Sequence, residues 1–253
     1  MKIDLSGRTA LVTGASGELG RVITRTLAGC GADVAIHYNR NRDMADKLLA
    51  EVKGLGRRAM VVQADVTDPA SVQQMQTAVA KGLGDPDILV NNAVIQYTWA
   101  SVLDQPVEDY EGQFRSCTVH NVLMAQAFAP AMIARKWGRI IALNTECAMQ
   151  CHPSQSAYAA GKRGMDGLLR VLAAEIGEHN ITVNQVAPGW MISDKFRAAG
   201  TQRQPDYEKL IPLRHRGEDQ DVANAVAFLA SDLAAFITGV YLPVCGGNVM
   251  PRI

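Results

Sequence analysis

The sequence predicts an α/β fold built on a doubly wound, mostly parallel seven-stranded sheet with helices on both faces. Short β-branched apolar runs alternate along the chain with longer helical patterns. Hydrophobic residues make up 48% of the 253 residues and charged residues 20%, which leaves enough apolar surface for a core. Because strand and helix alternate, the strands are expected to run parallel, with helices covering both faces of the sheet.

Seven apolar runs are predicted to be strands, at residues 9–13, 33–38, 59–64, 88–91, 139–143, 182–186 and 239–243. Helical patterns between them include residues 44–55, 71–83, 102–135 and 157–178. Residues 191–216 break this rhythm, because they are polar and are interrupted by Gly200, Pro205 and Pro212. We therefore expect a single domain over residues 1–253, with residues 191–216 as a loop or substrate lid within it.

Charge and cysteine content disfavour several classes of protein. Lys plus Arg equal Asp plus Glu and the pI is about 7.0, so no basic field attracts nucleic acid or an anionic membrane. The start MKIDLSGRTALVTG has charges where a signal peptide is apolar, and no later run approaches the ~20 apolar residues of a membrane span. Five cysteines without a CxxC pair indicate reduced thiols, so we expect a cytoplasmic protein with no bound metal.

A glycine-rich turn follows the first predicted strand. Gly14, Gly17 and Gly20 precede helical sequence that starts at Arg21. Glycines let the backbone approach a pyrophosphate, whose charge meets the free N–H groups of a helix N-terminus, as in Rossmann-type folds. The turn predicts a dinucleotide site, with a plain tight turn between strand and helix as the alternative.

The end of the second predicted strand indicates which dinucleotide binds. NAD-binding folds often place an acidic residue about 20 residues after the glycines, where this chain has Arg40. No carboxylate occurs between His37 and Arg42, so a 2′-phosphate would meet cations rather than repulsion. NADP is therefore favoured over NAD, unless these arginines are only solvated charges that open a helix.

The helix predicted at 157–178 contains Tyr158 and Lys162, which a spacing of four places on one helical face. A phenol has a pKa near ~10 and needs a neighbouring cation to act as an acid or base at working pH. Lys162 is placed to be that cation. A pair that merely decorates the helix surface is the alternative.

Together the motifs resemble the short-chain dehydrogenase/reductase family over nearly the whole chain. The signatures occur in order: the turn from Gly14 to Gly20, Asp65-Val66, Asn91-Asn92-Ala93, Tyr158 to Lys162, Asn184 with Pro188-Gly189, and Ile237-Thr238-Gly239. The combination is far more specific than any one of its parts.

The resemblance implies a role for each matching residue. Tyr158 would be the general acid in reduction, and Lys162 would hold the nicotinamide ribose and lower the pKa of the phenol. The residues implied to bind NADP or NAD are Gly14, Ser16, Gly17, Glu18, Leu19, Gly20, Asn39, Arg40, Asp65, Val66, Asn91, Ala93, Tyr158, Lys162, Pro188, Gly189 and Met191. Those implied to contact the substrate are Val94, Ile95, Met149, Cys151, Trp190 and Phe196. Turn capping by Asp65 and strand-end bonding by Asn91 are the structural alternatives.

Four positions depart from the family pattern. Thr145 stands where the family has a serine, and its hydroxyl can still donate to the substrate oxygen. Cys117 stands where the family has a catalytic asparagine, and Asn121 lies one turn later on the same face. Asn121 or a water is the candidate for the proton relay from Lys162, with a core cysteine and a helix-surface asparagine as the alternative. Glu18 and Val94 replace usual glycines, so Glu18 is expected to point away from the pyrophosphate.

The favoured activity is reversible NAD(P)-dependent carbonyl reduction and alcohol oxidation by hydride transfer, on a small-molecule carbonyl or alcohol. A catalytically weakened nucleotide-binding regulator and an epimerase or dehydratase that retains its cofactor are the alternatives. The resemblance also implies a homotetramer or homodimer, packed through the long helices near residues 102–135 and 157–178.

Overall fold

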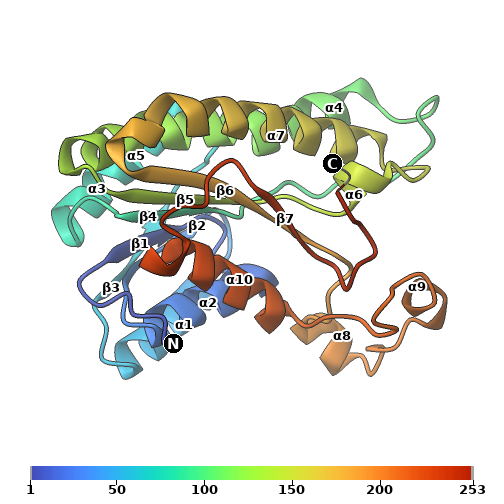
Figure 1. The fold of residues 1–253 in the computed structure, drawn as a ribbon, viewed down its shortest axis with the longest axis horizontal. Coiled ribbons are helices and arrows are strands. Elements are labelled where there is room, and N and C mark those ends of the chain that lie inside the picture. Colours follow the sequence, from blue (N-terminus) through green and yellow to red (C-terminus); the bar gives the residue numbers. More distant parts are fainter. Residues whose placement is uncertain (1, 252–253) are drawn as a thin grey trace.

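The computed structural model describes residues 2–251 and contains one sheet of seven parallel strands (Figure 1). The strands are β1 (Thr9–Val12), β2 (Asp33–Tyr38), β3 (Ala59–Gln63), β4 (Ile88–Asn91), β5 (Gly138–Leu143), β6 (Ile181–Pro188) and β7 (Tyr241–Val244). The helices are α1 (Glu18–Gly29), α2 (Arg42–Gly54), α3 (Pro69–Gly82), α4 (Val107–Phe114), α5 (His120–Arg135), α6 (Cys147–Gln150), α7 (Ser156–Ile176), α8 (Asp194–Ala198), α9 (Pro205–Glu208) and α10 (Asp219–Ala230). The predicted fold class is confirmed.

The helices form two layers, with α1, α2 and α10 on one face of the sheet and α3, α5 and α7 on the other (Figure 1). Alternate residues of each strand enter opposite cores: Ala10 and Val12 of β1 pack under α1 and α10, whereas Leu11 packs under α3 and α5. Both faces are therefore dry, which explains why the strands read as continuous apolar runs.

The strand order β3-β2-β1-β4-β5-β6-β7 places the point of reversal between β1 and β4. The chain builds outward from β1 to β3, then returns to pair β4 with β1, with Val12 opposite Val90. Ligands of doubly wound sheets bind beyond the carboxyl ends of the strands at this reversal. The glycine-rich turn and Asn91 both follow these strand ends.

Most element ends differ from the prediction by one to three residues, and three regions differ in more than that. The helix predicted at 102–135 begins only at Val107, after Pro106, and is interrupted by a π-helical turn at Arg115–Val119. The last strand begins at Tyr241 because Gly239 adopts a positive φ of 73° in the preceding turn. The segment 191–216, predicted as irregular, carries the two short helices α8 and α9.

The continuous helical stretch Val107–Arg135 is long and apolar enough, by length and composition, to cross a membrane. The prediction that no segment approaches a membrane span is therefore wrong by that criterion. In the fold, its buried residues Met124, Phe128 and Met132 belong to the core under α5 and α7. The apolar character of its buried face is explained by its place against the sheet.

Candidate active site

The glycine-rich turn bends sharply between β1 and α1. Gly14 adopts a φ of 64°, and the Gly17 N–H donates to the Gly14 carbonyl at 3.0 Å. Gly17 caps α1 without any side-chain hydrogen bond, so no side chain competes for the first N–H groups of the helix. This arrangement fits a dinucleotide pyrophosphate, which needs close backbone approach and free N–H donors.

Two side chains hold this turn in place. His37 of β2 lies buried beneath it, accepts the Gly14 N–H at Nδ1 (2.9 Å) and contacts the Ala64 carbonyl through Nε2 (3.1 Å). Asn92 Nδ2 donates to the Thr13 and Gly14 carbonyls, at 3.0 and 3.2 Å. Sequence reasoning missed the role of His37, whose only signal was a polar residue inside an apolar strand.

The two arginines after β2 differ in their surroundings. Arg42 donates to Asp46 and to the Tyr38 hydroxyl, so its guanidinium is engaged in the protein. Arg40 is exposed, follows the exposed Asn39, and makes no ion pair within the described part of the chain. Arg40 is therefore the cation that remains available to an anionic ligand.

Asp65 and Val66 follow β3. The Thr67 N–H and hydroxyl both donate to Asp65 Oδ1, and these bonds hold the pKa of that carboxyl below its usual range. Asp65 thus caps a turn, which was the structural alternative considered from the sequence. Val66 is buried. A contact of either residue with adenine stays a prediction.

Tyr158 and Lys162 face each other on α7. The Lys162 Nζ lies 5.8 Å from the centroid of the Tyr158 ring and donates to the Leu143 carbonyl at the end of β5. Lys162 is only 4% exposed. The spacing of four residues therefore brings the pair together at the carboxyl end of the sheet, as predicted.

The expected effect of Lys162 on the phenol is not seen in the net pKa. Burial is the largest influence and raises the pKa of Tyr158 above its ordinary value, while a hydrogen bond from Thr145 lowers it. Burial also lowers the pKa of Lys162. Desolvation, which a sequence does not reveal, dominates the pKa of Tyr158, and a lowering of that pKa by Lys162 stays a prediction.

Thr145 occupies the predicted serine position beside Tyr158. Its hydroxyl accepts the Cys147 N–H at 3.2 Å, and its carbonyl accepts the Tyr241 hydroxyl at 2.6 Å. These bonds fix the short segment between β5 and α6. Thr145 is therefore held in place by the Cys147 backbone and by a side chain from β7.

Cys117 lies in the π-helical turn and is buried, as a core cysteine would be. Asn121 Nδ2 donates a hydrogen bond to the Cys117 carbonyl at 2.7 Å. Asn121 Oδ1 in turn accepts a hydrogen bond from Asn91 Nδ2 at 2.7 Å. Asn121 is thus buried, and the helix-surface alternative is wrong. Asn91 Oδ1 is buried without a hydrogen-bond partner among the described residues, which leaves it as an acceptor for a ligand or water.

Aromatic side chains approach Tyr158 and the end of β6. Trp99 stacks on the Tyr158 ring with centroids 6.3 Å apart, and the Tyr97 hydroxyl accepts the Tyr158 N–H at 2.8 Å. Trp190 packs edge-on against Phe196 at 5.9 Å. Sequence reasoning named Trp190 and Phe196 but missed Tyr97 and Trp99.

The other residues named for substrate or cofactor are spread around the same strand ends. Val94 packs against the core, so its side chain is partly taken up by packing. Ile95 and Cys151 are exposed, and Met149 lies on α6. Pro188 ends β6, and the Met191 carbonyl accepts from Arg216. Ser16, Glu18, Leu19 and Ala93 lie in or beside the glycine-rich turn.

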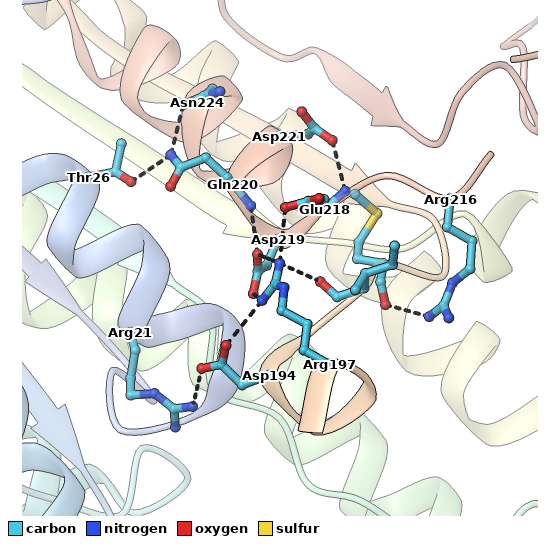
Figure 2. A network of polar contacts seen from close by, with 12 residues as sticks. Arg21, Thr26, Asp194, Arg197, Arg216, Glu218, Asp219, Gln220, Asp221 and Asn224 are labelled. Carbon is cyan, nitrogen blue, oxygen red and sulfur yellow. Dashed lines mark hydrogen bonds and ion pairs between the residues drawn. The ribbon is translucent and has the colours of Figure 1, made fainter. Parts of the chain in front are cut away.

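The segment 191–216 is tied to α1 and α10 by ion pairs (Figure 2). Arg21 of α1 donates to the Ser16 carbonyl in the glycine-rich turn and to Asp194 of α8 at 3.0 Å. Arg197 binds Asp194 and Asp219, the latter at 2.7 Å. Sequence reasoning did not foresee this link between the turn and the segment.

A family model described as Enoyl-(Acyl carrier protein) reductase matches residues 14–248. The chain belongs to the short-chain dehydrogenase/reductase family. It is 36% identical to the 3-oxoacyl-[acyl-carrier-protein] reductase FabG of Staphylococcus epidermidis, over 96% of this chain and 99% of that protein. It is 35% identical to the L-rhamnose 1-dehydrogenase (NAD(P)(+)) of a Sphingomonas species, over 96% of each chain.

Solved structures of other proteins superpose closely on this chain. A blue fluorescent protein from a metagenomic library, in complex with NADPH, has a TM-score of 0.89 and 34% identity, covering 98% of this chain and 100% of its own. A 7α-hydroxysteroid dehydrogenase with NADH and 7-oxo glycochenodeoxycholic acid has a TM-score of 0.88 and 31% identity, covering 97% and 96%. The chain is an NAD(P)-dependent oxidoreductase of this family, and the alternatives of a regulator or an epimerase are not favoured.

Proposed function

We propose that this short-chain dehydrogenase/reductase is an NADP-preferring carbonyl reductase that also oxidises alcohols, with Tyr158 as general acid and base. The observation that carries the proposal is the group formed by Tyr158, Lys162 and Thr145. Thr145 follows the carboxyl end of β5, and Tyr158 and Lys162 lie in the N-terminal part of α7. A phenol, an amine and a hydroxyl converge beside strand ends that fit a dinucleotide.

The chemistry divides between cofactor and protein. When bound, the reduced nicotinamide supplies the hydride that forms the new C–H bond at the carbonyl carbon. Tyr158 gives its phenolic proton to the carbonyl oxygen, and Thr145 donates a hydrogen bond to the same oxygen. Because burial raises the pKa of Tyr158, the phenol holds its proton at neutral pH and suits the reductive direction. Raising the pH should favour oxidation, which needs the phenolate.

The substrate is proposed to be a small or medium carbonyl compound with an apolar portion. Trp99 lies on the Tyr158 ring, and Trp190 with Phe196 forms a second aromatic group after β6. Such side chains favour apolar rings and chains, while the polar groups of Thr145 and Tyr158 orient one oxygen.

The test is hydride transfer from NADPH or NADH to a panel of ketones, aldehydes, 3-oxoacyl thioesters and sugar lactones, followed by the absorbance of the reduced nicotinamide. Tyr158→Phe should lower kcat/KM by about 10²- to 10⁴-fold, since it removes the acid. NADPH binding, measured by fluorescence, should be retained. A Phe variant as active as the parent, or no transfer to any carbonyl, would refute the proposal.

The preference for NADP is proposed from Arg40. Arg40→Ala should weaken NADPH binding by about 10- to 100-fold, because a charged hydrogen bond to the 2′-phosphate is lost, and should leave NADH binding almost unchanged. Arg42→Ala is the matched control, because its guanidinium is already engaged by Asp46 and Tyr38. Equal losses for the two cofactors would disprove the role of Arg40.

We further propose a cytoplasmic homotetramer or homodimer. Exposed apolar side chains on α4 and α7, among them Val107, Phe114 and Val171, support packing between copies. All five cysteines are free, which supports a reducing compartment. Light scattering of the purified protein measures the mass, and a monomer would count against this assembly.

A further inference from the structure

A buried carboxylate lies next to Thr145 and belongs to none of the family signatures. Glu146 is only 4% exposed, and its N–H donates to the Pro188 carbonyl at 2.9 Å. The residue is therefore held between the carboxyl ends of β5 and β6. An isolated buried carboxylate is costly, so its side chain needs hydrogen-bond donors.

Two distant segments supply those donors. The hydroxyl of Tyr207, on α9, donates to Glu146 Oε1 at 2.6 Å, and Asn248 Nδ2, after β7, donates to Oε2 at 3.0 Å. Burial raises the pKa of Glu146, and these two bonds partly oppose that rise. One side chain thus joins the end of β5 to the segment 191–216 and to the C-terminal part of the chain.

Tyr207 also contacts Trp190, through a hydrogen bond and through its ring. The Trp190 N–H donates to the Tyr207 hydroxyl oxygen at 2.7 Å, and the two rings meet edge-on with centroids 5.5 Å apart. Space around the hydroxyl is tight: a Cβ on Gly189 would lie 2.6 Å from it and 3.0 Å from Glu146 Oε2. Gly189 therefore has a packing role beside the cofactor role that the family resemblance implies.

The other end of the segment 191–216 is held by ion pairs. The pairs of Arg21 with Asp194 and of Arg197 with Glu218 involve exposed carboxylates, whereas the pair of Arg197 with Asp219 involves a buried one (Figure 2). Exposed pairs contribute about 0–1 kcal/mol each, because water screens them. Buried carboxylates therefore hold the segment at two places, Asp219 at Arg197 of α8 and Glu146 at Tyr207 of α9.

We propose that Glu146 is a positioning residue for the carbonyl substrate: its carboxylate fixes Tyr207, and Tyr207 fixes Trp190 at the edge of the catalytic site. The effect on substrate rests on the proposed function, whereas the anchoring of the segment does not. The ligand class concerned is the apolar portion of the carbonyl compound, which meets Trp190.

Kinetics test the effect on substrate. Glu146→Gln keeps the shape but turns one acceptor into a donor that faces Tyr207 or Asn248, and Tyr207→Phe removes one donor. Either change should raise KM for the carbonyl substrate by about 10- to 100-fold with kcat changed less than about threefold, since one bond to a charged group is lost. The double variant should be little worse than either single variant, because both break one connection. A fall in kcat with unchanged KM would overturn the positioning role.

Limited trypsin digestion tests the anchor without any activity. Arg203 and Lys209 lie in the segment, and cleavage after them should become at least about tenfold faster in both variants if local opening costs less free energy. Asp206→Asn is the matched control, because it breaks only the exposed pair between Asp206 and Lys209, the residue that follows α9. Unchanged cleavage in Tyr207→Phe, which keeps Glu146, would overturn the anchor. Faster cleavage of the two variants, together with no carbonyl reduction by the parent protein, would refute the proposed function but not the anchor.

Discussion

The cofactor end and the catalytic end of the site satisfy their polar groups in opposite ways. Around β1 and β2, neutral side chains form hydrogen bonds with backbone groups: His37 accepts the Gly14 N–H, and Asn92 donates to two carbonyls of the turn. At the ends of β5 and β6, backbone and neutral groups form the hydrogen bonds that buried ionisable side chains need. Lys162 donates to the Leu143 carbonyl, and Glu146 accepts from Tyr207.

This difference predicts different sensitivities. The path of the main chain defines the cofactor end. Its stability and its binding of NADPH should therefore suffer when a side-chain atom is added to a glycine, and its stability should suffer when His37 gains a proton. The catalytic end is defined by functional groups, so it should fail when a hydroxyl or charge is removed while the shape is kept. Each experiment below tests one side of this contrast.

Among the tests of this contrast, the largest effect is expected at Thr145. Thr145→Val keeps the shape and removes the hydroxyl, so kcat should fall by about 10²- to 10³-fold, the usual cost of losing one donor to a developing oxyanion. Thr145→Ser keeps the hydroxyl and should stay within a few-fold of the parent. Steady-state reduction of the best carbonyl substrate measures both. Equal activity of the Val and Ser variants would contradict the catalytic role of the hydroxyl.

A smaller effect is expected when one carbon is added to the cofactor end. A Cβ on Gly20 would lie 2.2 Å from the Gly14 carbonyl oxygen and 2.8 Å from Ala15 Cα, so backbone must shift. Gly20→Ala should lose about 1–3 kcal/mol of stability by overpacking and weaken NADPH binding. Gly29→Ala, in the same helix, meets nothing within 4 Å and serves as control. Urea unfolding and NADPH titration of both variants make the measurement, and similar losses in the two would remove the steric argument.

The parts of the site that the sequence predicted are local motifs. Gly14 to Gly20 and the Tyr158–Lys162 pair lie within one turn of chain or helix, where spacing alone fixes geometry. The strands were predictable because both faces of the sheet are buried, so each reads as an apolar run. Only their ends moved, by a few residues.

The parts that escaped prediction depend on distant segments or on burial. Glu146 meets Tyr207 61 residues later and Asn248 102 residues later, and no spacing rule connects them. His37 reaches the glycine turn only because β2 pairs beside β1. The pKa of Tyr158 rises because the surrounding segments partly desolvate its ring, which a sequence does not show.

The smallest effect is expected on the stability of the fold at acid pH, where His37 is protonated in the unfolded chain. Burial lowers the pKa of His37 from 6.5 to about 4, while the Ala64 carbonyl and Asp65 oppose that change. Below about pH 6.5 the unfolded chain takes up the proton before the folded chain does, so stability present at neutral pH is lost as the pH falls. At pH 5 the loss from this group should be about 2 kcal/mol.

His37→Asn isolates that contribution, because an amide does not titrate in this range and its oxygen can still accept the Gly14 N–H. The free energy of unfolding in urea, measured at pH 7 and pH 5, should drop by about 2 kcal/mol less in the variant than in the parent. His120 is also buried, with a pKa lowered to about 3, and its effect is common to both proteins. Equal drops would mean that His37 is not held neutral. The cofactor turn would then lose its distinguishing dependence on an uncharged side chain, and the contrast with the charged catalytic end would rest on glycine packing alone.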